Sequence, residues 1–274
     1  MSATSNSGVR FPAVTPCFSL VLLLFASLTL ALPRGRATEI TPAERARFVA
    51  QAKKVFAVAL QRFEKEPTNI VAAWEFARAG FDRAEYSTNN AERAALAAQC
   101  IAVCREALKR ESNCAPAHYY LGMNLGQLAQ TKMLGALKIV DEMEREFKAA
   151  LKLDERLDRA GPDRNLGLLY FEAPVIGSVG SRSKARKHLE RAVEVAPDFP
   201  ENRLNLAAAY AQWHDKKLLQ RELDALDKLW PAAKTNFIGA EWEPAWIDWQ
   251  QRREKLREKA ADSSNPLASP RAKN

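Results

Sequence analysis

The chain has 274 residues, of which 47% are hydrophobic and 27% are charged, and its formal net charge is +8. This length and hydrophobic content allow a sizeable core, which excludes a chain disordered throughout. Only 11 glycines accompany many Ala, Leu, Glu, Lys and Arg residues, a mixture that favours helices over strands. The basic excess is diffuse and lacks the concentrated stripe of a nucleic-acid binder, so we predict no nucleic-acid partner.

The first 37 residues have the character of an export signal. Arg10 lies in an acid-free leader, an apolar run extends from Phe18 to Leu32, and Gly35-Arg36-Ala37 offers small residues for cleavage before Thr38. The run is shorter than the roughly 20 apolar residues of a membrane-spanning helix. We therefore expect a signal peptide over residues 1–37 and a location in the bacterial periplasm. The alternative is an uncleaved leader that anchors the protein in the inner membrane.

Three helices are expected next. Between Pro42 and Lys65 the apolar residues recur at every third or fourth position, and Thr41 followed by Glu44 makes a helix start. Pro67 ends this helix. The second is expected at about 69–83, with Trp74, Ala77 and Phe81 spaced like the first helix of a repeat, and the third at 92–109.

Three cysteines and a histidine in this region allow three interpretations. Cys100 and Cys104 lie four apart on the third helix, and Cys114 and His118 lie four apart beyond it, which resembles a Cys3His zinc set. Counting back from Gly122, however, places Cys100 and Cys104 at packing positions of a repeat, where buried cysteine behaves as a small hydrophobe. We favour core packing. A Cys104–Cys114 disulfide and a metal site remain alternatives, and we predict no metal and no cofactor.

Further repeats follow in the second half of the chain. One opens at Pro116, with its second helix expected at 133–153, and Gly161-Pro162 starts another. Pro197 and Pro231 then lie 34 residues apart, the period of the tetratricopeptide repeat, and each is expected to end a copy of it. In these copies small residues let the two helices approach, and bulky residues fill the gaps between pairs. We predict an all-α solenoid of tetratricopeptide-like helical pairs over residues 38–259.

The end of the chain breaks the period. Trp242, Trp246 and Trp249 share one face of a final helix that runs toward Lys259. We expect this helix to cap the open end of the solenoid, with an interfacial membrane helix as the alternative. Residues 260–274 are expected to form a disordered tail.

The motifs within residues 74–231 resemble the T component of tripartite ATP-independent periplasmic transporters. The resemblance rests on His118-Tyr119-Tyr120-Leu121-Gly122, Gly161-Pro162 with Arg164, Leu166-Gly167, Ala173-Pro174, and Ala196-Pro197 with Pro200-Glu201-Asn202. It implies an exported helical protein that associates with a periplasmic solute-binding protein and forms homo-oligomers.

No catalytic motif is present in the sequence, so we predict that the protein is not an enzyme. The binding surface of such a solenoid is usually its concave side, lined by the first helix of each pair. Projecting the repeat register inward predicts a partner-binding or ligand-binding groove of Tyr119, Met123, Asn124, Gln127, Arg164, Leu168, Phe171, Asn202 and Asn205, with Leu204 and Ala208 beside them.

Arg164 allows two interpretations. In a groove its guanidinium would hold a carboxylate by two hydrogen bonds. In a structural role it would bind a helix-end carbonyl or a nearby acid such as Asp158. Our leading hypothesis is an exported scaffold for a protein partner, with a solute-binding protein of a transport system as the expected partner. The alternatives are a carrier for a small apolar or anionic ligand and a membrane-anchored envelope assembly factor.

Overall fold

The structure is a computed structural model that describes residues 40–132 and 135–262. Within these two ranges the chain forms ten α-helices and no strand, so the predicted all-α class is confirmed. The predicted leader, and residues 263–274 of the predicted tail, lie outside the described residues. In chain order the helices are α1 (Pro42–Lys65), α2 (Ile70–Glu85), α3 (Asn90–Arg110), α4 (Ala115–Gln130), α5 (Ala136–Leu153), α6 (Gly161–Glu172), α7 (Arg182–Val195), α8 (Pro200–Gln212), α9 (Lys216–Asn236) and α10 (Glu243–Asp262).

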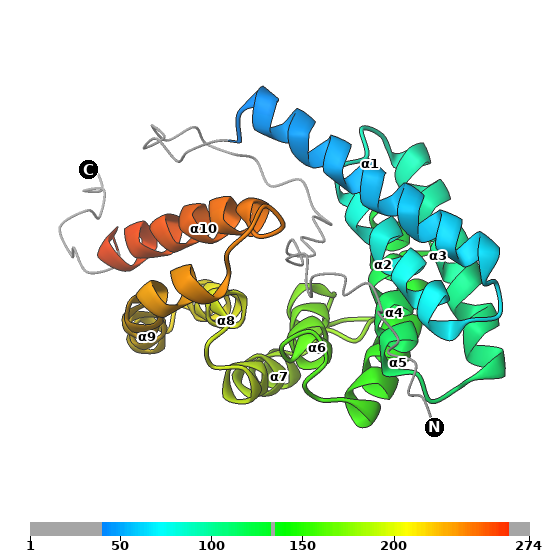
Figure 1. The fold of residues 1–274 in the computed structure, drawn as a ribbon. Coiled ribbons are helices and arrows are strands. Elements are labelled where there is room, and N and C mark those ends of the chain that lie inside the picture. Colours follow the sequence, from blue (N-terminus) through cyan, green and yellow to red (C-terminus); the bar gives the residue numbers. More distant parts are fainter. Residues whose placement is uncertain (1–39, 133–134, 263–274) are drawn as a thin grey trace, which may run out of the picture.

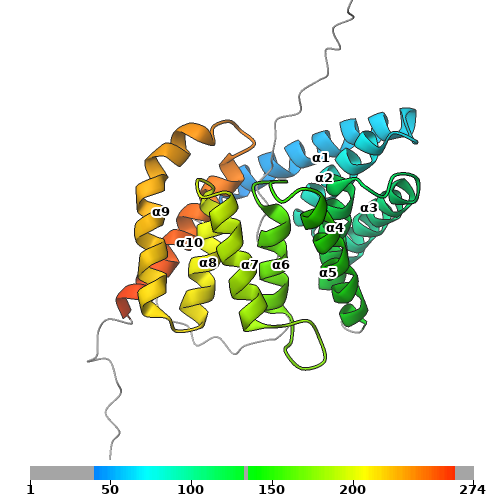
Figure 2. The ribbon, with the colours of Figure 1, turned by 90° about the horizontal axis from the view of Figure 1, so that it is seen from below.

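Helices α2 to α9 pack as four consecutive pairs, α2 with α3, α4 with α5, α6 with α7 and α8 with α9. Figure 1 shows that the first helix of each pair lies on the inside of a curve and the second on the outside. Figure 2 shows α6 to α9 side by side along this array. The two ends of the curve meet where Arg47 of α1 forms an ion pair of 2.7 Å with Glu243 of α10.

Side chains at the helix starts explain several of these boundaries. Thr41 and Glu44, which the sequence marks as a helix start, form a capping box at α1, in which each side chain binds the backbone of the other residue. Asn69 and Asn89 accept backbone hydrogen bonds at the starts of α2 and α3, and Ser181 and Asp215 do the same for α7 and α9. Local sequence therefore sets five of these helix starts before tertiary packing is considered.

Pro231 does not end its helix, contrary to the sequence prediction. Helix α9 continues through Pro231 to Asn236, although proline removes one helical hydrogen bond and crowds the preceding turn. Trp230 and Ala233, on either side of it, are both buried. The Trp230 ring lies edge-on to Trp246 of α10, with the ring centroids 5.3 Å apart. Packing against α10 thus outweighs the local preference of proline to stop the helix.

Close packing within the pairs depends on glycine. A Cβ atom on Gly122 would lie 2.6 Å from the Phe147 ring of α5, and one on Gly167 would lie 2.7 Å from Leu189 of α7. Both distances are too short for real contacts, so the two helices of each pair approach more closely than alanine would permit. The small positions of the predicted repeats therefore have the role expected from the sequence.

Helix α10 covers the end of the array by packing on α8 and α9, as predicted for a cap. Trp242, just before the helix, and Trp249 are buried, and Trp246 donates from Nε1 to the Phe237 carbonyl at 2.7 Å. The helix extends to Asp262, past the predicted start of the tail. Of the helices in the described ranges, none combines the length and apolar character that a membrane crossing requires.

Candidate functional site

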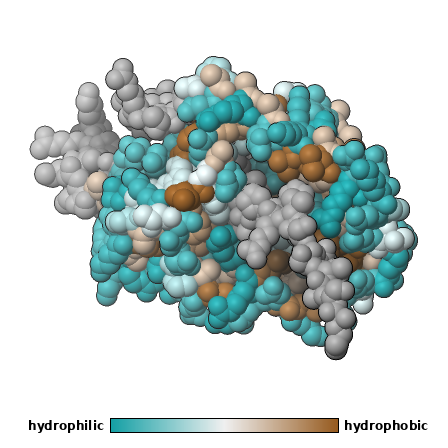
Figure 3. All heavy atoms as spheres, viewed as in Figure 1, coloured by the Kyte–Doolittle hydropathy of each residue, from teal (hydrophilic) through white to brown (hydrophobic). Residues whose placement is uncertain are grey.

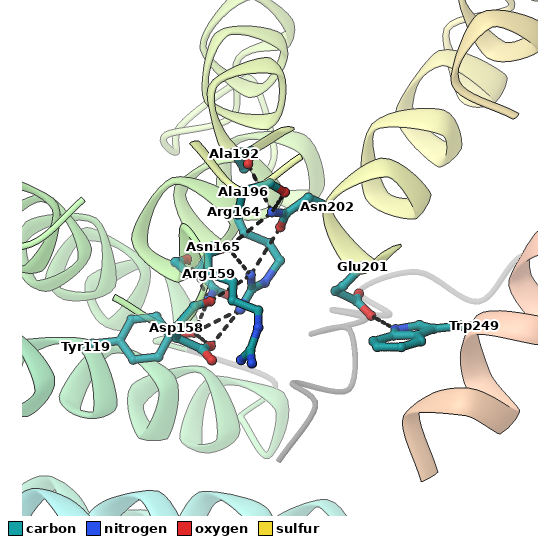
Figure 4. Close-up of polar contacts among 11 residues, drawn as sticks. Tyr119, Asp158, Arg159, Arg164, Asn165, Ala192, Ala196, Glu201, Asn202 and Trp249 are labelled. Carbon is teal, nitrogen blue, oxygen red and sulfur yellow. Dashed lines mark hydrogen bonds and ion pairs between the residues drawn. The ribbon is translucent and has the colours of Figure 1, made fainter. Parts of the chain in front are cut away.

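The predicted groove residues lie on α4, α6 and α8, three of the helices that line the inside of the curve in Figure 1. Most of them are buried, and only Phe171 and Ala208 are half-buried. Figure 4 shows that Tyr119, Arg164 and Asn202 come together, although they belong to three different helices. The structure therefore brings the centre of the predicted site together as a network of internal hydrogen bonds.

Arg164 is the centre of this network. Its Nη2 lies 2.7 Å from the Asp158 carboxylate, and its Nη1 donates to the Asp158 carbonyl at 3.2 Å and the Arg159 carbonyl at 3.1 Å. Nη1 also donates to the Asn202 side chain at 3.1 Å. The Tyr119 hydroxyl donates to the same Asp158 carboxylate at 2.7 Å. Of the two interpretations of Arg164, the structure realises the structural one, with the acid and the carbonyl partners expected for it.

The backbone held by Arg164 is strained. Asp158, Arg159 and Ala160 have φ angles of 48°, 54° and 62°, so three successive residues other than glycine occupy the left-handed region. Each such residue costs of order 1–3 kcal/mol and persists only where its surroundings fix it. Asn202 also stabilises the backbone of this turn, because its Nδ2 donates to the Arg159 carbonyl at 3.1 Å and to the Ala192 carbonyl at 3.0 Å. This turn, which joins α5 to α6, is therefore held in one conformation by side chains from α6 and α8.

The other predicted polar residues also join neighbouring helices. Asn124 donates to the Ala77 carbonyl of α2 at 3.0 Å, and Gln127 donates to the Glu85 carboxylate at the end of α2. Asn205 accepts a hydrogen bond from Arg252 of α10. Met123, Leu168 and Leu204 are buried in the core, and the Phe171 ring packs edge-on against Trp213 at 5.7 Å. These side chains hold the array together between pairs.

A second polar network attaches the capping helix. Glu201 of α8 is buried, accepts from Trp249 Nε1 at 2.7 Å and lies 2.6 Å from Arg252 Nη1. Burial acts to raise the pKa of Glu201, but the charge and hydrogen bond of Arg252 outweigh it and leave the pKa below its ordinary value. Glu201 is therefore ionised, and its charge helps to hold α10 on α8.

Sequence reasoning missed Arg159, which the strained turn presents toward the inside of the curve. Its guanidinium carbon lies 5.3 Å from the Phe199 ring centroid and 5.1 Å from those of Phe237 and Trp242. Figure 4 shows this side chain pointing away from the Arg164 network. No short motif marks such a residue, because its position depends on a turn and on aromatic residues about 40 and 80 positions along the chain.

A cavity lies on the same inner side, between α1, α2 and the segment that joins α9 to α10. Its volume is about 360 Å³. Its apolar lining includes Phe48, Val55 and Trp74, and its polar lining includes Arg78, Asp82 and Glu241. Figure 3 shows the molecule from the side of Figure 1, with hydrophobic residues exposed among hydrophilic ones on this face. Helix α1, which the sequence suggested only as the first helix of the domain, thus contributes one wall of this cavity.

The cysteines take the packing positions that we favoured. Cys100 and Cys104 are buried in the hydrophobic core as free thiols, and Cys114 is a buried free thiol at the start of α4. Burial raises the pKa of Cys100 to about 12. His118 is the fourth residue of the alternative Cys3His zinc site. Its Nδ1 lies 2.6 Å from the Glu146 carboxylate, and its Nε2 lies 2.9 Å from the Ser112 carbonyl. In the described ranges, no group of three or more potential metal ligands is assembled.

Comparison with known proteins supports the fold. Residues 43–159 match the family described as Regulator of microtubule dynamics protein 1-3, which is less than half of the chain. No curated protein matches. Among solved structures, TTC0263, a thermophilic TPR protein of Thermus thermophilus, is 17% identical with a TM-score of 0.53, over 79% of this chain and 98% of that chain. MamA is 15% identical with a TM-score of 0.42, over 82% of this chain and 99% of that chain.

The similarity to TTC0263, together with the four packed pairs, shows a tetratricopeptide-like helical-pair solenoid. The predicted architecture is therefore confirmed. The resemblance to a transporter T component, the export signal and the location stay predictions.

Proposed function

We propose that this protein is an exported helical-pair scaffold that binds a protein partner, a periplasmic solute-binding protein of a transport system. The array of packed pairs supports the scaffold role, because such arrays present extended surfaces for binding. The export signal and the motifs that resemble a transporter T component support the location and the class of partner. On this proposal the mature protein begins near Thr38, and N-terminal sequencing that finds Met1 instead would favour the membrane-anchored alternative.

The observation that carries the proposal is the loop between α6 and α7, which projects from the array in Figure 2. Its base is tied by backbone hydrogen bonds from Gly180 to Pro174 at 3.1 Å and from Ser181 to Tyr170 at 2.9 Å. At its tip Val175 and Ile176 are 74% and 93% exposed, the highest values among large hydrophobic side chains in the described ranges. Two adjacent aliphatic side chains are thus exposed to solvent on a loop whose ends are fixed by hydrogen bonds. Such side chains are suited to contact with another protein.

The test is capture of the partner from periplasmic extract by the tagged chain, with the captured proteins identified by mass spectrometry. We expect the original chain to recover a solute-binding protein and the Val175→Ser/Ile176→Ser variant to lose it. Both positions are exposed, so the fold should be unaffected. Ile238→Ser is the matched control, because Ile238 is 68% exposed on a different loop. Equal recovery by all three chains, or recovery of no solute-binding protein, would contradict the proposal.

A second candidate function is carriage of a small ligand, and the cavity beside α1 and α2 favours it. A volume of about 360 Å³ falls in the range of small-molecule sites, and the lining is mainly apolar with a few polar side chains. The two functions are compatible, because the cavity lies inside the curve and the exposed loop projects outward.

A further inference from the structure

The charged residues that line the cavity beside α1 and α2 are mostly acidic. They are three carboxylates and one guanidinium, from Glu75, Asp82, Glu241 and Arg78. The chain as a whole carries a formal net charge of +8, so the balance around the cavity is the reverse of that of the protein. A space lined by an excess of one sign of charge attracts the opposite sign. The cavity therefore favours a cation over an anion.

Two of the three carboxylates are matched by arginines. Glu75 forms an ion pair with Arg62 of α1. Asp82 and Arg78 are four residues apart on α2 and both line the cavity, so they share one face of that helix and their charges offset each other. The negative charge that remains in the lining belongs to Glu241, which comes from the segment between α9 and α10.

This segment holds Glu241 at the wall of the cavity. Phe237 before it and Trp242 after it are buried, and their ring centroids lie 4.8 Å apart. The Trp242 backbone N–H donates to the Gly239 carbonyl at 3.0 Å. Gly239 has a φ angle of 113°, which favours glycine, and a Cβ atom there would clash with the Glu241 carboxylate. The segment therefore has a defined conformation, and the carboxylate occupies space that only glycine leaves free.

Glu241 is half-buried, and no basic side chain in residues 40–132 and 135–262 forms an ion pair with it. Arg47 of α1, on the other wall, pairs instead with Glu243 at 2.7 Å. A partly desolvated carboxylate without a cation retains its capacity to bind one, and charge-assisted hydrogen bonds of this kind are strong. Glu241 is thus the residue of the lining best suited to bind a positive group.

The rest of the lining indicates what the positive group belongs to. The Trp74 ring is stacked on Tyr120, with the centroids 6.0 Å apart, and lines the cavity together with Phe48 and Val55. Aromatic rings attract ammonium groups and also pack against the carbon atoms attached to them. A hard metal ion would require several oxygen ligands. One unmatched carboxylate beside apolar walls suits a single ammonium group on an apolar body.

We infer that the cavity binds a small amine with an apolar body, whose ammonium group pairs with the Glu241 carboxylate. The ammonium would donate hydrogen bonds to that carboxylate, and the apolar walls would cover the body of the ligand. The inference rests on the second candidate function, carriage of a small ligand, and gives that ligand its chemical class. It does not depend on the protein partner.

The test is calorimetric titration of the full chain at neutral pH with hexylamine, hexan-1-ol and hexanoate, which share an apolar body and differ in the head group. We expect hexylamine to bind at least about tenfold more tightly than hexan-1-ol, and hexanoate to bind more weakly than the alcohol. Glu241→Gln should weaken hexylamine binding about tenfold and leave the binding of hexan-1-ol unchanged. Glu254→Gln is the matched control, because Glu254 is exposed on α10 outside the lining.

A second variant tests whether the ligand lies in the cavity. Ala240 lines the cavity and is exposed, so Ala240→Trp should preserve the fold and fill part of the space. We expect it to weaken the binding of hexylamine and of hexan-1-ol alike. Binding of both compounds at the original affinity would place the ligand outside the cavity and overturn the inference.

Two further outcomes would overturn it. Equal affinity for hexylamine and hexan-1-ol would show an apolar cavity without a cation site, and hexylamine binding unaffected by Glu241→Gln would place the ammonium elsewhere. Either result would leave the carrier function standing. Absence of binding by all three compounds would end the carrier function as well, whereas the partner capture experiment would stand unaffected.

Discussion

The Asp158 carboxylate lies 2.7 Å from the Arg164 guanidinium, and the side chains of both residues are almost completely enclosed. The same guanidinium binds the carbonyls of Asp158 and Arg159. One side chain therefore pairs with the Asp158 carboxylate and also holds the backbone of the strained turn. This turn presents Arg159 to the inner face. The arginine that the sequence suggested as a ligand-binding residue therefore acts to position another arginine.

Replacement of Arg164 by methionine should strongly destabilise the fold. The change leaves the Asp158 carboxylate buried without its cation, and removal of one partner of a buried pair costs about 3–5 kcal/mol. The free energy of unfolding from urea denaturation measures this loss. The double variant Arg164→Met/Asp158→Asn should lose less unfolding free energy than Arg164→Met alone, because no buried carboxylate is left without its cation. Arg191→Met removes exposed pairs with Glu155 and Glu194 and should leave the midpoint unchanged. A loss below about 1 kcal/mol in Arg164→Met would contradict the anchoring role.

Attachment of the capping helix should weaken in acid through Glu201. The folded-state pKa of Glu201 lies below its ordinary 4.5, so its stabilising contribution is present above pH 4.5 and is lost as pH falls through the folded pKa. Unfolding free energies measured from pH 6 downward should therefore decline more steeply in the original chain than in Glu201→Gln. Asp227→Asn, which removes more exposed pairs to Arg253 and Arg257, is the comparison and should change the slope less. Identical slopes for the original chain and Glu201→Gln would exclude this explanation.

The helices and the fold class could be predicted because they depend on local signals. Apolar spacing and the capping residues Thr41, Asn69 and Asn89 lie within a few positions of the structure that they determine. Pro231 shows where this reasoning fails, since its tolerance depends on burial of Trp230 against α10. A tertiary contact there outweighs a local preference, and one sequence alone does not reveal it.

For the candidate site, repeat register predicts which side chains lie near one another but not what they do. In the structure Tyr119, Arg164 and Asn202 lie together, as expected of residues at equivalent positions of successive pairs, while their role in binding a partner stays a prediction. Repeat register did not distinguish an open groove from an internal network, which depends on the Asp158–Ala160 turn and its positive φ angles. Arg159 and the cavity were missed because they depend on the curvature that brings α1 near α10.

Glu85 should give the protein a stability that falls as pH rises. Burial raises the pKa of this carboxyl from 4.5 to about 7, and the hydrogen bond from Gln127 opposes the rise only in part. Between these two pH values the folded state retains a proton that the unfolded chain has released. The unfolding free energy therefore falls as pH increases from 4.5 to 7, by at most about 3 kcal/mol at 1.36 kcal/mol per pKa unit.

Glu85→Gln tests this dependence, because glutamine keeps a hydrogen-bond acceptor for Gln127 and cannot ionise. Urea denaturation at a series of pH values should show a flatter profile and a higher stability above pH 7 in the variant. Glu64→Gln, on the surface of α1, is the control and should retain the original profile. A variant profile that keeps the original slope would show that another group is responsible.

The contact between Gly80 of α2 and Cys100 of α3 should behave as a coupled pair. A Cβ atom on Gly80 would lie only 2.1 Å from the Cys100 Sγ. Gly80→Ala should therefore destabilise the fold by about 1–3 kcal/mol through overpacking, although alanine in a helix is intrinsically favoured over glycine by about 1 kcal/mol. Cys100→Ala should cost roughly 1 kcal/mol, because it leaves a small cavity above Gly80.

The double variant Gly80→Ala/Cys100→Ala should recover most of the lost stability. The new Cβ at position 80 would occupy the space of the missing sulfur, and its distance to the Cβ at position 100 would be 3.7 Å, an ordinary contact. A double-mutant cycle of unfolding free energies should thus give a coupling of about 1–3 kcal/mol in favour of the pair. Strictly additive losses would contradict it. A favourable coupling would show that Cys100 occupies its position for its volume, since a metal ligand or a disulfide partner could not be exchanged for alanine in this way.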